Sequence, residues 1–273
     1  MRALTYLRRP SVAALAAIAL APALRLVHLG RDSLWYDETV SAYLAMQSPL
    51  EAIAHTALDI HPPAYYLALG LWTRLAGASE YSLAFFSASF GVLLVALTGL
   101  VARRCFGPQA ALVATWLAAA SSYGIWYSQE VRMYTPAACL ACLMVLITLS
   151  LADRPGRLGT AAAWGLTAAL SLYTLYYLAF LLVAVSLYWL ARASRRTRDG
   201  HRWAAWLLGH ATAALAYLPW LPVAIRQALD PPVPPWRSAL PIGAMLRDAS
   251  LALFAGEALP TGLWPVAAGF ILL

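Results

Sequence analysis

Runs of about 20 predominantly apolar residues recur along this chain, and they constrain its fold more than any other feature. A helix needs about 20 such residues to cross the hydrocarbon core of a bilayer. We identify eight candidate spans, at residues 11–29, 82–102, 108–126, 135–152, 158–173, 175–191, 203–221 and 249–273. The composition agrees, because only 11% of the residues are charged, whereas a water-soluble domain has about 25%. The sequence therefore predicts an all-α polytopic membrane protein with a single transmembrane domain over residues 1–273.

The first and last runs and the junction of the fifth and sixth allow other interpretations. The first run follows a basic segment as a signal peptide would, but Arg25 and His28 stand near its end instead of a small-residue cleavage site. The fifth and sixth runs are separated only by a polar cluster at residues 173–177. The last run ends at Leu273 without a polar tail, so we expect the chain to be truncated at its C-terminus.

The distribution of Arg predicts the orientation. All 19 basic residues are Arg, and with a cytoplasmic N-terminus the connections on that side hold 12 of them but only two of the 12 acidic residues. Cytoplasmic loops of membrane proteins carry such an excess of basic residues. We therefore expect a multi-pass protein of the bacterial plasma (inner) membrane, with its active site on the external side. The lipid bilayer accounts for the net charge of +7, and we expect no nucleic-acid partner.

A long external loop, residues 30–81, separates the first two spans. Ser48, Pro49 and Glu51 have the spacing of a helix start, with Ser as the N-cap, Pro in the first turn and Glu three residues after the cap. A second helix is predicted at residues 64–75, after a Pro-Pro pair. We expect the first helix to lie in the plane of the membrane interface. The second should be juxtamembrane or re-entrant, because a full crossing by it would place Arg103 and Arg104 outside.

The few acidic residues form clusters with His or Arg on the external side. The clusters are Asp37 with Glu38, Asp59 with His61, and Glu130 with Arg132. Ionisable groups at membrane depth are costly unless they are paired or face a watery cavity, and they often mark functional sites. Each cluster has a structural alternative: a solvated helix start, a loop residue before proline, or a simple external ion pair. The three Cys residues are interpreted as small helix residues without a redox or metal role.

These side chains suit the transfer of a group from a phosphate-bearing donor. A carboxylate beside a hydroxyl can act as a general base, and Arg offers a planar fork for phosphate oxygens. A divalent metal is an open alternative, with Asp37, Asp59, His61 and Glu130 as candidate ligands. The chain has no phosphate-binding Gly-rich motif before a helix, and an external site has little access to cytoplasmic nucleotide sugars. We therefore expect a lipid-linked phosphate donor.

Three motifs together resemble the polyprenyl-phosphate-sugar-dependent GT-C glycosyltransferases, which include protein O-mannosyltransferases and aminoarabinose transferases. The motifs are Leu34-Trp35-Tyr36-Asp37-Glu38, Asp59-x-His61-Pro62-Pro63-x-Tyr65-Tyr66 and Trp126-Tyr127-Ser128-Gln129-Glu130-x-Arg132-Met133-Tyr134. The likeness covers roughly residues 24–177, and its third motif is the most specific. It implies a GT-C-like helix bundle, a polyprenyl-phosphate sugar donor, and a lipid, glycan or protein acceptor in the cell envelope.

The resemblance also implies roles for individual residues. Asp37 matches the acid regarded as the catalytic base, with Glu38 beside it as a second catalytic candidate. The residues that match motifs at the donor phosphate and substrate are Asp59, His61, Tyr127, Glu130, Arg132 and Tyr134. The chain departs from many relatives at residues 173–177, where those relatives carry a His between Thr and Tyr. Any role for that His is absent here.

Two other classes of function compete with an inverting glycosyltransferase of the hexosyltransferase class. A transporter or lipid flippase would show inverted repeats and broken spans near the midplane, but the sequence has no internal repeat and its polar clusters lie outside the membrane core. A catalytically silent relative is the third class, and the presence of Asp37 and Arg132 argues against it.

Overall fold

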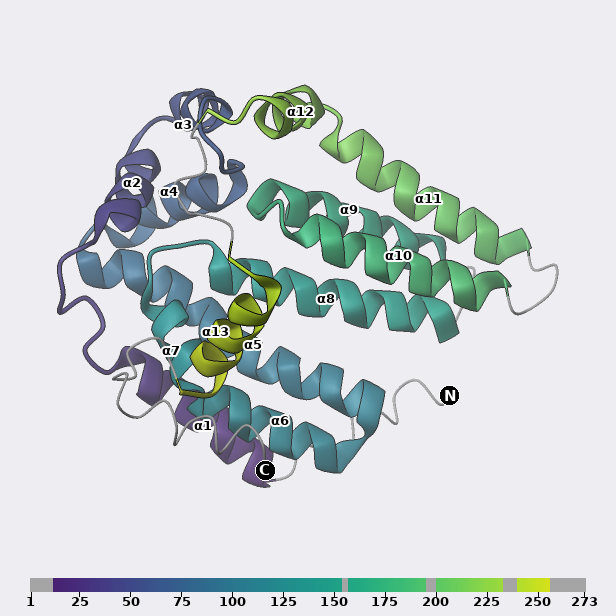
Figure 1. Cartoon of the computed structure of the whole chain (residues 1–273), viewed down its shortest axis with the longest axis horizontal. Helices are drawn as coiled ribbons and strands as arrows, with labels where there is room; N and C mark the ends of the chain where they lie inside the picture. The colour runs from purple at the N-terminus through teal and green to yellow at the C-terminus, as the bar shows by residue number, and fades with distance from the viewer. Residues whose placement is uncertain (1–11, 154–156, 195–199, 233–239, 256–273) are drawn as a thin grey trace.

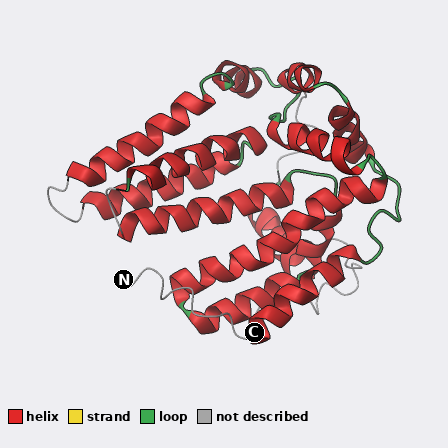
Figure 2. Ribbon diagram, turned by 180° about the vertical axis from the view of Figure 1, so that it is seen from behind, coloured by secondary structure: helices red, strands yellow, loops and turns green. Residues whose placement is uncertain are grey.

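The computed structural model describes residues 12–153, 157–194, 200–232 and 240–255, and within these ranges every regular element is a helix (Figures 1 and 2). The predicted all-α class is confirmed. The helices are α1 (Val12–Leu26), α2 (Tyr36–Met46), α3 (Pro49–Ala57), α4 (Ala64–Ala76), α5 (Glu80–Phe106), α6 (Pro108–Ala120), α7 (Ser122–Gln129), α8 (Tyr134–Asp153), α9 (Leu158–Thr174), α10 (Leu178–Ser194), α11 (Gly200–Tyr217), α12 (Leu221–Leu229) and α13 (Ile242–Ala255).

Two of these helices, α5 and α8, are long and apolar enough to cross a bilayer alone. A third crossing is formed if α11 and α12, which meet at an angle of 76°, are one broken span. The helices α1, α6 and α10 are apolar but shorter. The chain is therefore a helical membrane protein, and the arrangement with eight spans stays a prediction. The helix α13 includes the first residues of the last expected span, 249–273. The rest of that span, residues 256–273, lies outside the described ranges.

The expected span at residues 108–126 is interrupted at Ser121, where α6 ends and α7 begins. The Ser121 hydroxyl oxygen accepts a hydrogen bond of 3.0 Å from the backbone N–H of Gly124. Ser favours helix N-caps because its side chain competes for backbone groups. This local bond starts a new helix inside an apolar run, and α7 then leads into the segment between Gln129 and Tyr134.

The long helices pack in two groups that meet where α5 contacts α8. Small residues of α1, α5 and α6 form one core, around Ala17, Val95 and Ala119, while α8, α9, α10 and α11 surround Trp164 and Trp189. The C-terminal ends of α5, α8 and α10 lie at one end of the bundle, and α2, α3, α4 and α12 lie at the other end (Figure 1). The arrangement gathers the predicted external loop and the polar clusters at one end.

The helices of the loop between the first two spans follow the predicted pattern. The Ser48 hydroxyl accepts from the N–H of Glu51, and the Glu51 carboxylate accepts from the N–H of Ser48, so the predicted capping box at the start of α3 is confirmed. The predicted second helix is α4. Its Tyr65 and Leu69 are buried against α2 and α5 in an apolar core. This core holds the loop helices on the end of the bundle as a rigid support for the side chains described next.

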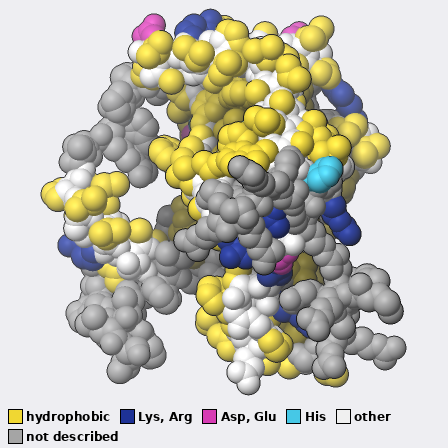
Figure 3. All heavy atoms as spheres, turned by 90° about the vertical axis from the view of Figure 1, so that its right-hand side faces the viewer, with side chains coloured by type: hydrophobic (Ala, Val, Ile, Leu, Met, Phe, Trp, Pro, Cys, Tyr) yellow, Lys and Arg dark blue, Asp and Glu magenta, His cyan; other side chains and the backbone are white. Residues whose placement is uncertain are grey.

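The outer faces of the bundle are apolar. Figure 3 looks onto the end of the bundle at which α5, α8 and α10 end, and shows broad hydrophobic areas beside scattered Arg side chains. Large side chains such as Phe180, Leu207 and Leu215 are exposed on these helices. Contiguous apolar surface of this kind is expected where lipid, rather than water, covers the protein.

Candidate active site

A cavity of about 1380 Å³ opens between the loop helices and the segment that joins α7 to α8. All eight residues that the sequence singled out line this one cavity: Asp37, Glu38, Asp59, His61, Tyr127, Glu130, Arg132 and Tyr134. They come from three segments that lie far apart in the sequence. The folding of the chain therefore brings together the three polar clusters that were predicted to share one side of the membrane.

The start of α2 gives its two acidic residues different surroundings. One carboxylate oxygen of Glu38 accepts a hydrogen bond of 2.7 Å from the backbone N–H of Val131, and the other accepts one of 3.2 Å from Trp35. Glu38 is buried, whereas 37% of the Asp37 side chain is exposed in the cavity. Backbone amides thus engage both oxygens of Glu38, while Asp37 presents its carboxylate to an incoming ligand.

Arg132 contacts Asp37 and is almost completely buried, with 3% of its side chain exposed. Its Nη2 atom lies 3.6 Å from Asp37 Oδ2, and its Nη1 atom donates a hydrogen bond of 3.3 Å to the Asp37 carbonyl oxygen. The expected alternative is an ion pair with Glu130; the contacts that the described residues give Arg132 are with Asp37 and His61. The Glu130 carboxylate instead accepts a hydrogen bond of 2.9 Å from Trp126 Nε1.

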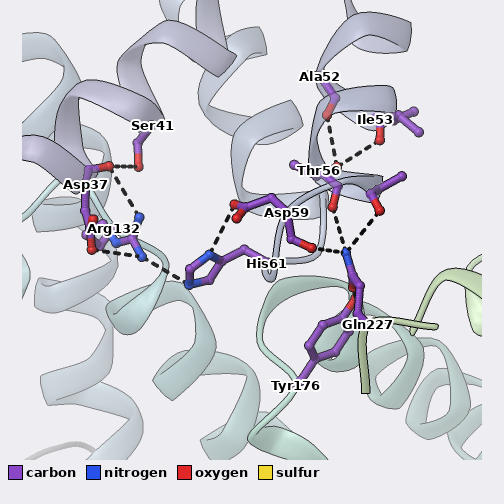
Figure 4. A network of polar contacts seen from close by, with 11 residues as sticks. Asp37, Ser41, Ala52, Ile53, Thr56, Asp59, His61, Arg132, Tyr176 and Gln227 are labelled. Carbon is purple, nitrogen blue, oxygen red and sulfur yellow. Dashed lines mark hydrogen bonds and ion pairs between the residues drawn. The ribbon is translucent and has the colours of Figure 1, made fainter. Parts of the chain in front are cut away.

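The loop between α3 and α4 brings Asp59 and His61 to the other side of Arg132 (Figure 4). His61 Nε2 lies 3.2 Å from Arg132 Nη2, and His61 Nδ1 lies 3.5 Å from Asp59 Oδ2. Burial works to raise the pKa of Asp59, but the hydrogen bonds from His61 and the Ile60 backbone outweigh it and lower that pKa. Asp59, His61, Arg132 and Asp37 therefore form one continuous polar chain along the cavity wall.

Aromatic side chains complete the surroundings of Arg132. Its guanidinium carbon lies 5.8 Å from the centre of the Tyr134 ring, which contacts Tyr127 edge to face. Burial works to lower the pKa of Arg132, but Tyr66, Tyr134 and Asp37 outweigh it and raise that pKa. Burial also raises the pKa of the Tyr66 hydroxyl to about 12. At neutral pH this site therefore holds a charged Arg132 beside an un-ionised Tyr66.

The candidate metal ligands are not gathered into one cluster. Within the described residues, no group of three or more His, Cys, Asp and Glu side chains has the geometry to hold a metal ion. Asp59 and His61 are neighbours, but Arg132 lies on the open side of the imidazole ring and also beside Asp37. A cation among these ligands would lie close to the Arg132 guanidinium, so the residues present do not fit a metal.

Two buried polar residues that the sequence analysis did not single out support the site. Arg25 of α1 donates to the carbonyl oxygens of Ala118 and Ala119, where α6 ends, and to Ser128 of α7. Gln227 of α12 contacts the backbone of the loop that carries Asp59. The signal for Arg25 was present in the sequence, because a cation inside an apolar run needs internal partners. Gln227 gave no such signal.

The comparison with known families supplies the remaining finding. The model of the dolichyl-phosphate-mannose-protein mannosyltransferase family matches residues 60–222, which is more than half of the chain. The match includes His61 and the whole motif from Trp126 to Tyr134, whereas Asp37 and Asp59 precede it. No curated protein and no solved structure matches the chain significantly.

Proposed function

The chain belongs to the dolichyl-phosphate-mannose-protein mannosyltransferase family, and we propose that it moves a sugar from a polyprenyl-phosphate donor to an acceptor hydroxyl. The family makes it a membrane glycosyltransferase of the GT-C type. This membership favours an enzyme over a transporter or lipid flippase. The observation that carries the proposal is the cavity itself, because Asp37, His61 and Arg132 meet there from three distant segments.

In this mechanism Asp37 is the general base. Its partly exposed carboxylate takes the proton of the acceptor hydroxyl as the acceptor oxygen forms a bond to the anomeric carbon. The bond from that carbon to the phosphate oxygen breaks in the same step, and the lipid phosphate leaves as an anion with the electron pair. A single displacement of this kind inverts the anomeric configuration. Glu38 is less suited to the task because backbone amides engage both of its oxygens.

We assign Arg132 to the leaving phosphate. A preorganised cation stabilises negative charge that develops in the transition state, most strongly where water is excluded. The guanidinium is buried and contacts both Asp37 and His61, so in this proposal a phosphate oxygen binds Arg132 beside the His61 imidazole. His61 and Asp59 then lie beside the phosphate, and Tyr127, Glu130 and Tyr134 line the same side of the cavity.

The test is the transfer of labelled sugar from synthetic polyprenyl-phosphate sugars by the purified protein. Asp37→Asn keeps the shape of the side chain but removes the base, so turnover should fall by roughly 10²–10⁴ while donor binding persists. Glu38→Gln is the matched control and should reduce turnover less. Near-normal turnover of Asp37→Asn, or a product that keeps the anomeric configuration of the donor, contradicts the mechanism.

We further propose that the loop helices α2–α4 face the outside and that the N-terminus is cytoplasmic. The support is the separation of these helices from the opposite end of the bundle, where the last turn of α5 carries Arg103 and Arg104 and that of α10 carries Arg192 (Figure 1). Cys105 lies exposed in the last turn of α5, whereas Cys139 is buried in α8. In intact cells Cys105 should react only with membrane-permeant thiol reagents, and a Cys at position 78 should react with impermeant ones. Labelling of Cys105 by an impermeant reagent contradicts this orientation.

A further inference from the structure

The loop that presents Asp59 and His61 begins at a helix end whose carbonyl groups need donors. The last carbonyl groups of any helix lack partners within it, and many helices solve this with a Gly after the last turn. Here α3 ends at Ala57 and continues through Leu58 in a right-handed conformation. The Thr56 carbonyl oxygen accepts a local hydrogen bond of 3.3 Å from the Asp59 backbone N–H, whereas the carbonyl oxygens of Ala57 and Asp59 lie past the helical hydrogen bonds and accept from elsewhere in the protein.

Gln227 of α12 provides these donors. Its Nε2 atom donates to the carbonyl oxygen of Thr56 at 2.9 Å, to that of Ala57 at 3.4 Å, and to that of Asp59. The side chain is 7% exposed, so water does not replace these bonds if they are lost. Gln227 thus caps the end of α3 from a helix that lies far away in the sequence.

Two aromatic residues fix the orientation of this carboxamide. The Tyr176 hydroxyl donates a hydrogen bond of 2.5 Å to Gln227 Oε1, and Trp220 Nε1 donates one of 2.8 Å to the Tyr176 oxygen. The bonds run in one direction, from the indole through the phenol and the amide to the loop carbonyls, and such chains strengthen each member. Tyr176 belongs to the polar cluster between α9 and α10 that the sequence analysis noted, and the proposed mechanism gives that cluster no role.

The chain of contacts continues from the loop to the reacting groups. From Asp59 it passes through His61 to Arg132 and Asp37 (Figure 4). Gln227 binds the backbone carbonyl of Asp59, and the side chain of Asp59 contacts His61. A shift of this loop therefore moves the imidazole relative to Arg132.

We propose that Gln227 is a positioning residue of the active site, and that with Tyr176 and Trp220 it sets where the loop presents Asp59 and His61 to Arg132. The inference rests on the proposed function for its catalytic consequence, but the positioning of the loop can be measured without catalysis. When a mutation far from the reacting atoms shifts a catalytic group by about 1 Å, the rate can fall by about 100-fold. Loss of the Gln227 contacts should therefore lower kcat more than it raises the KM for the donor.

The first experiment measures hydrogen exchange of the full chain in detergent micelles. Gln227→Met keeps the side-chain length but removes the amide. It should speed the exchange of backbone amides around residues 57–61 by about tenfold or more, because at least one buried hydrogen bond is lost. Tyr176→Phe should have a smaller effect in the same residues. Arg226→Ala is the matched control, because Arg226 donates to Ala57 from the exposed side of α12 and does not reach Asp59. Exchange in α8 should not change in any of the three.

The second experiment measures sugar transfer by the same three variants. We expect Gln227→Met to lower kcat by about 10- to 100-fold, Tyr176→Phe to lower it less, and Arg226→Ala to leave it near wild type. Unchanged loop exchange in Gln227→Met and Tyr176→Phe overturns the positioning role, as does faster loop exchange with wild-type kcat. If Gln227→Met does not fold, Tyr176→Phe decides the question by the same two readouts. An inactive wild-type protein counts against the proposed function, whereas the exchange result still decides whether Gln227 holds the loop.

Discussion

Arg25 and Arg132 are buried to a similar degree, at 2% and 3% exposure, but they have different kinds of partners. Arg25 contacts neutral oxygen atoms, namely the carbonyls that end α6 and the Ser128 hydroxyl. Arg132 contacts a carboxylate and an imidazole on the wall of the cavity. The comparison teaches that burial of a cation does not by itself identify a reactive site. Ionisable partners do identify one, because a carboxylate or an imidazole can take up or release a proton when a ligand binds.

The surroundings of Arg25 explain its structural role. A cation is favoured at the C-terminal end of a helix, where carbonyl groups point outward, and α6 ends at that point. Gly91 of α5 leaves the room for this contact, since a Cβ atom there would lie 2.2 Å from the Ser128 hydroxyl and 3.2 Å from Arg25 Nε. Gln129 also donates to the Arg25 carbonyl oxygen at 3.1 Å. Arg25 therefore stabilises the break between α6 and α7.

The largest effect on stability should come from Arg25→Met. The substitution keeps an apolar stem of similar length but leaves the carbonyl groups of Ala118 and Ala119 without their buried donor. Hydrogen bonds to charged groups contribute about 1.5–3 kcal/mol each, so the loss should be about 3 kcal/mol. Thermal unfolding in detergent should show a lower Tm, while the KM of the remaining folded enzyme for the donor stays near wild type. An equally large change in KM would place Arg25 in the site and break the comparison.

An intermediate effect, on function rather than on stability, is expected for Arg132→Lys. The positive charge is kept, but the planar fork that contacts Asp37 and His61 together is lost. The affinity for the lipid-phosphate donor should fall by about 1–3 kcal/mol. Donor titration monitored by intrinsic Trp fluorescence provides the measurement, with Arg25→Lys as the matched control. Wild-type donor affinity in Arg132→Lys would remove Arg132 from the phosphate site.

The smallest effect should come from Arg104→Gln at the other end of the bundle. Arg104 pairs with Asp153, but both side chains are partly exposed, and exposed ion pairs contribute about 0–1 kcal/mol. Both Tm and sugar transfer should stay close to wild type. A decrease in Tm as large as that of Arg25→Met would show that burial does not determine how much each arginine contributes to stability.

The sequence predicted the helix class and the starts of α3 and α4 because these depend on local chemistry. Apolar runs indicate helices that bury their backbone polar groups, and Ser48 with Glu51 specifies a helix start regardless of what surrounds it. The convergence of three polar clusters was predicted from their shared side of the membrane. The single cavity lined by Asp37, His61 and Arg132 agrees with that prediction, and the catalytic roles of these residues stay predictions.

The partners of individual side chains could not be predicted, because they depend on how distant segments pack. Glu130 is closer to Arg132 in sequence than Asp37 is, but α2 brings the Asp37 carboxylate to the guanidinium. Hydropathy did not register the break at Ser121, since one hydroxyl in an apolar run hardly changes the average. Gln227 lies in a short helix outside all three motifs, and only the packing of α12 on α3 reveals its contact with the loop.

The contact between Gln227 and the Asp59 loop also has a consequence for biosynthesis. The two residues are separated by 168 positions, so the ribosome must synthesise nearly all of the described chain before this contact can form. Contacts of such sequence separation form late, because the intervening chain must first be ordered. The earlier helices enter the membrane with the loop still unanchored. A nascent or prematurely terminated chain that lacks α12 should therefore hold the reactive side chains without the geometry to use them, which delays catalysis until the bundle is assembled.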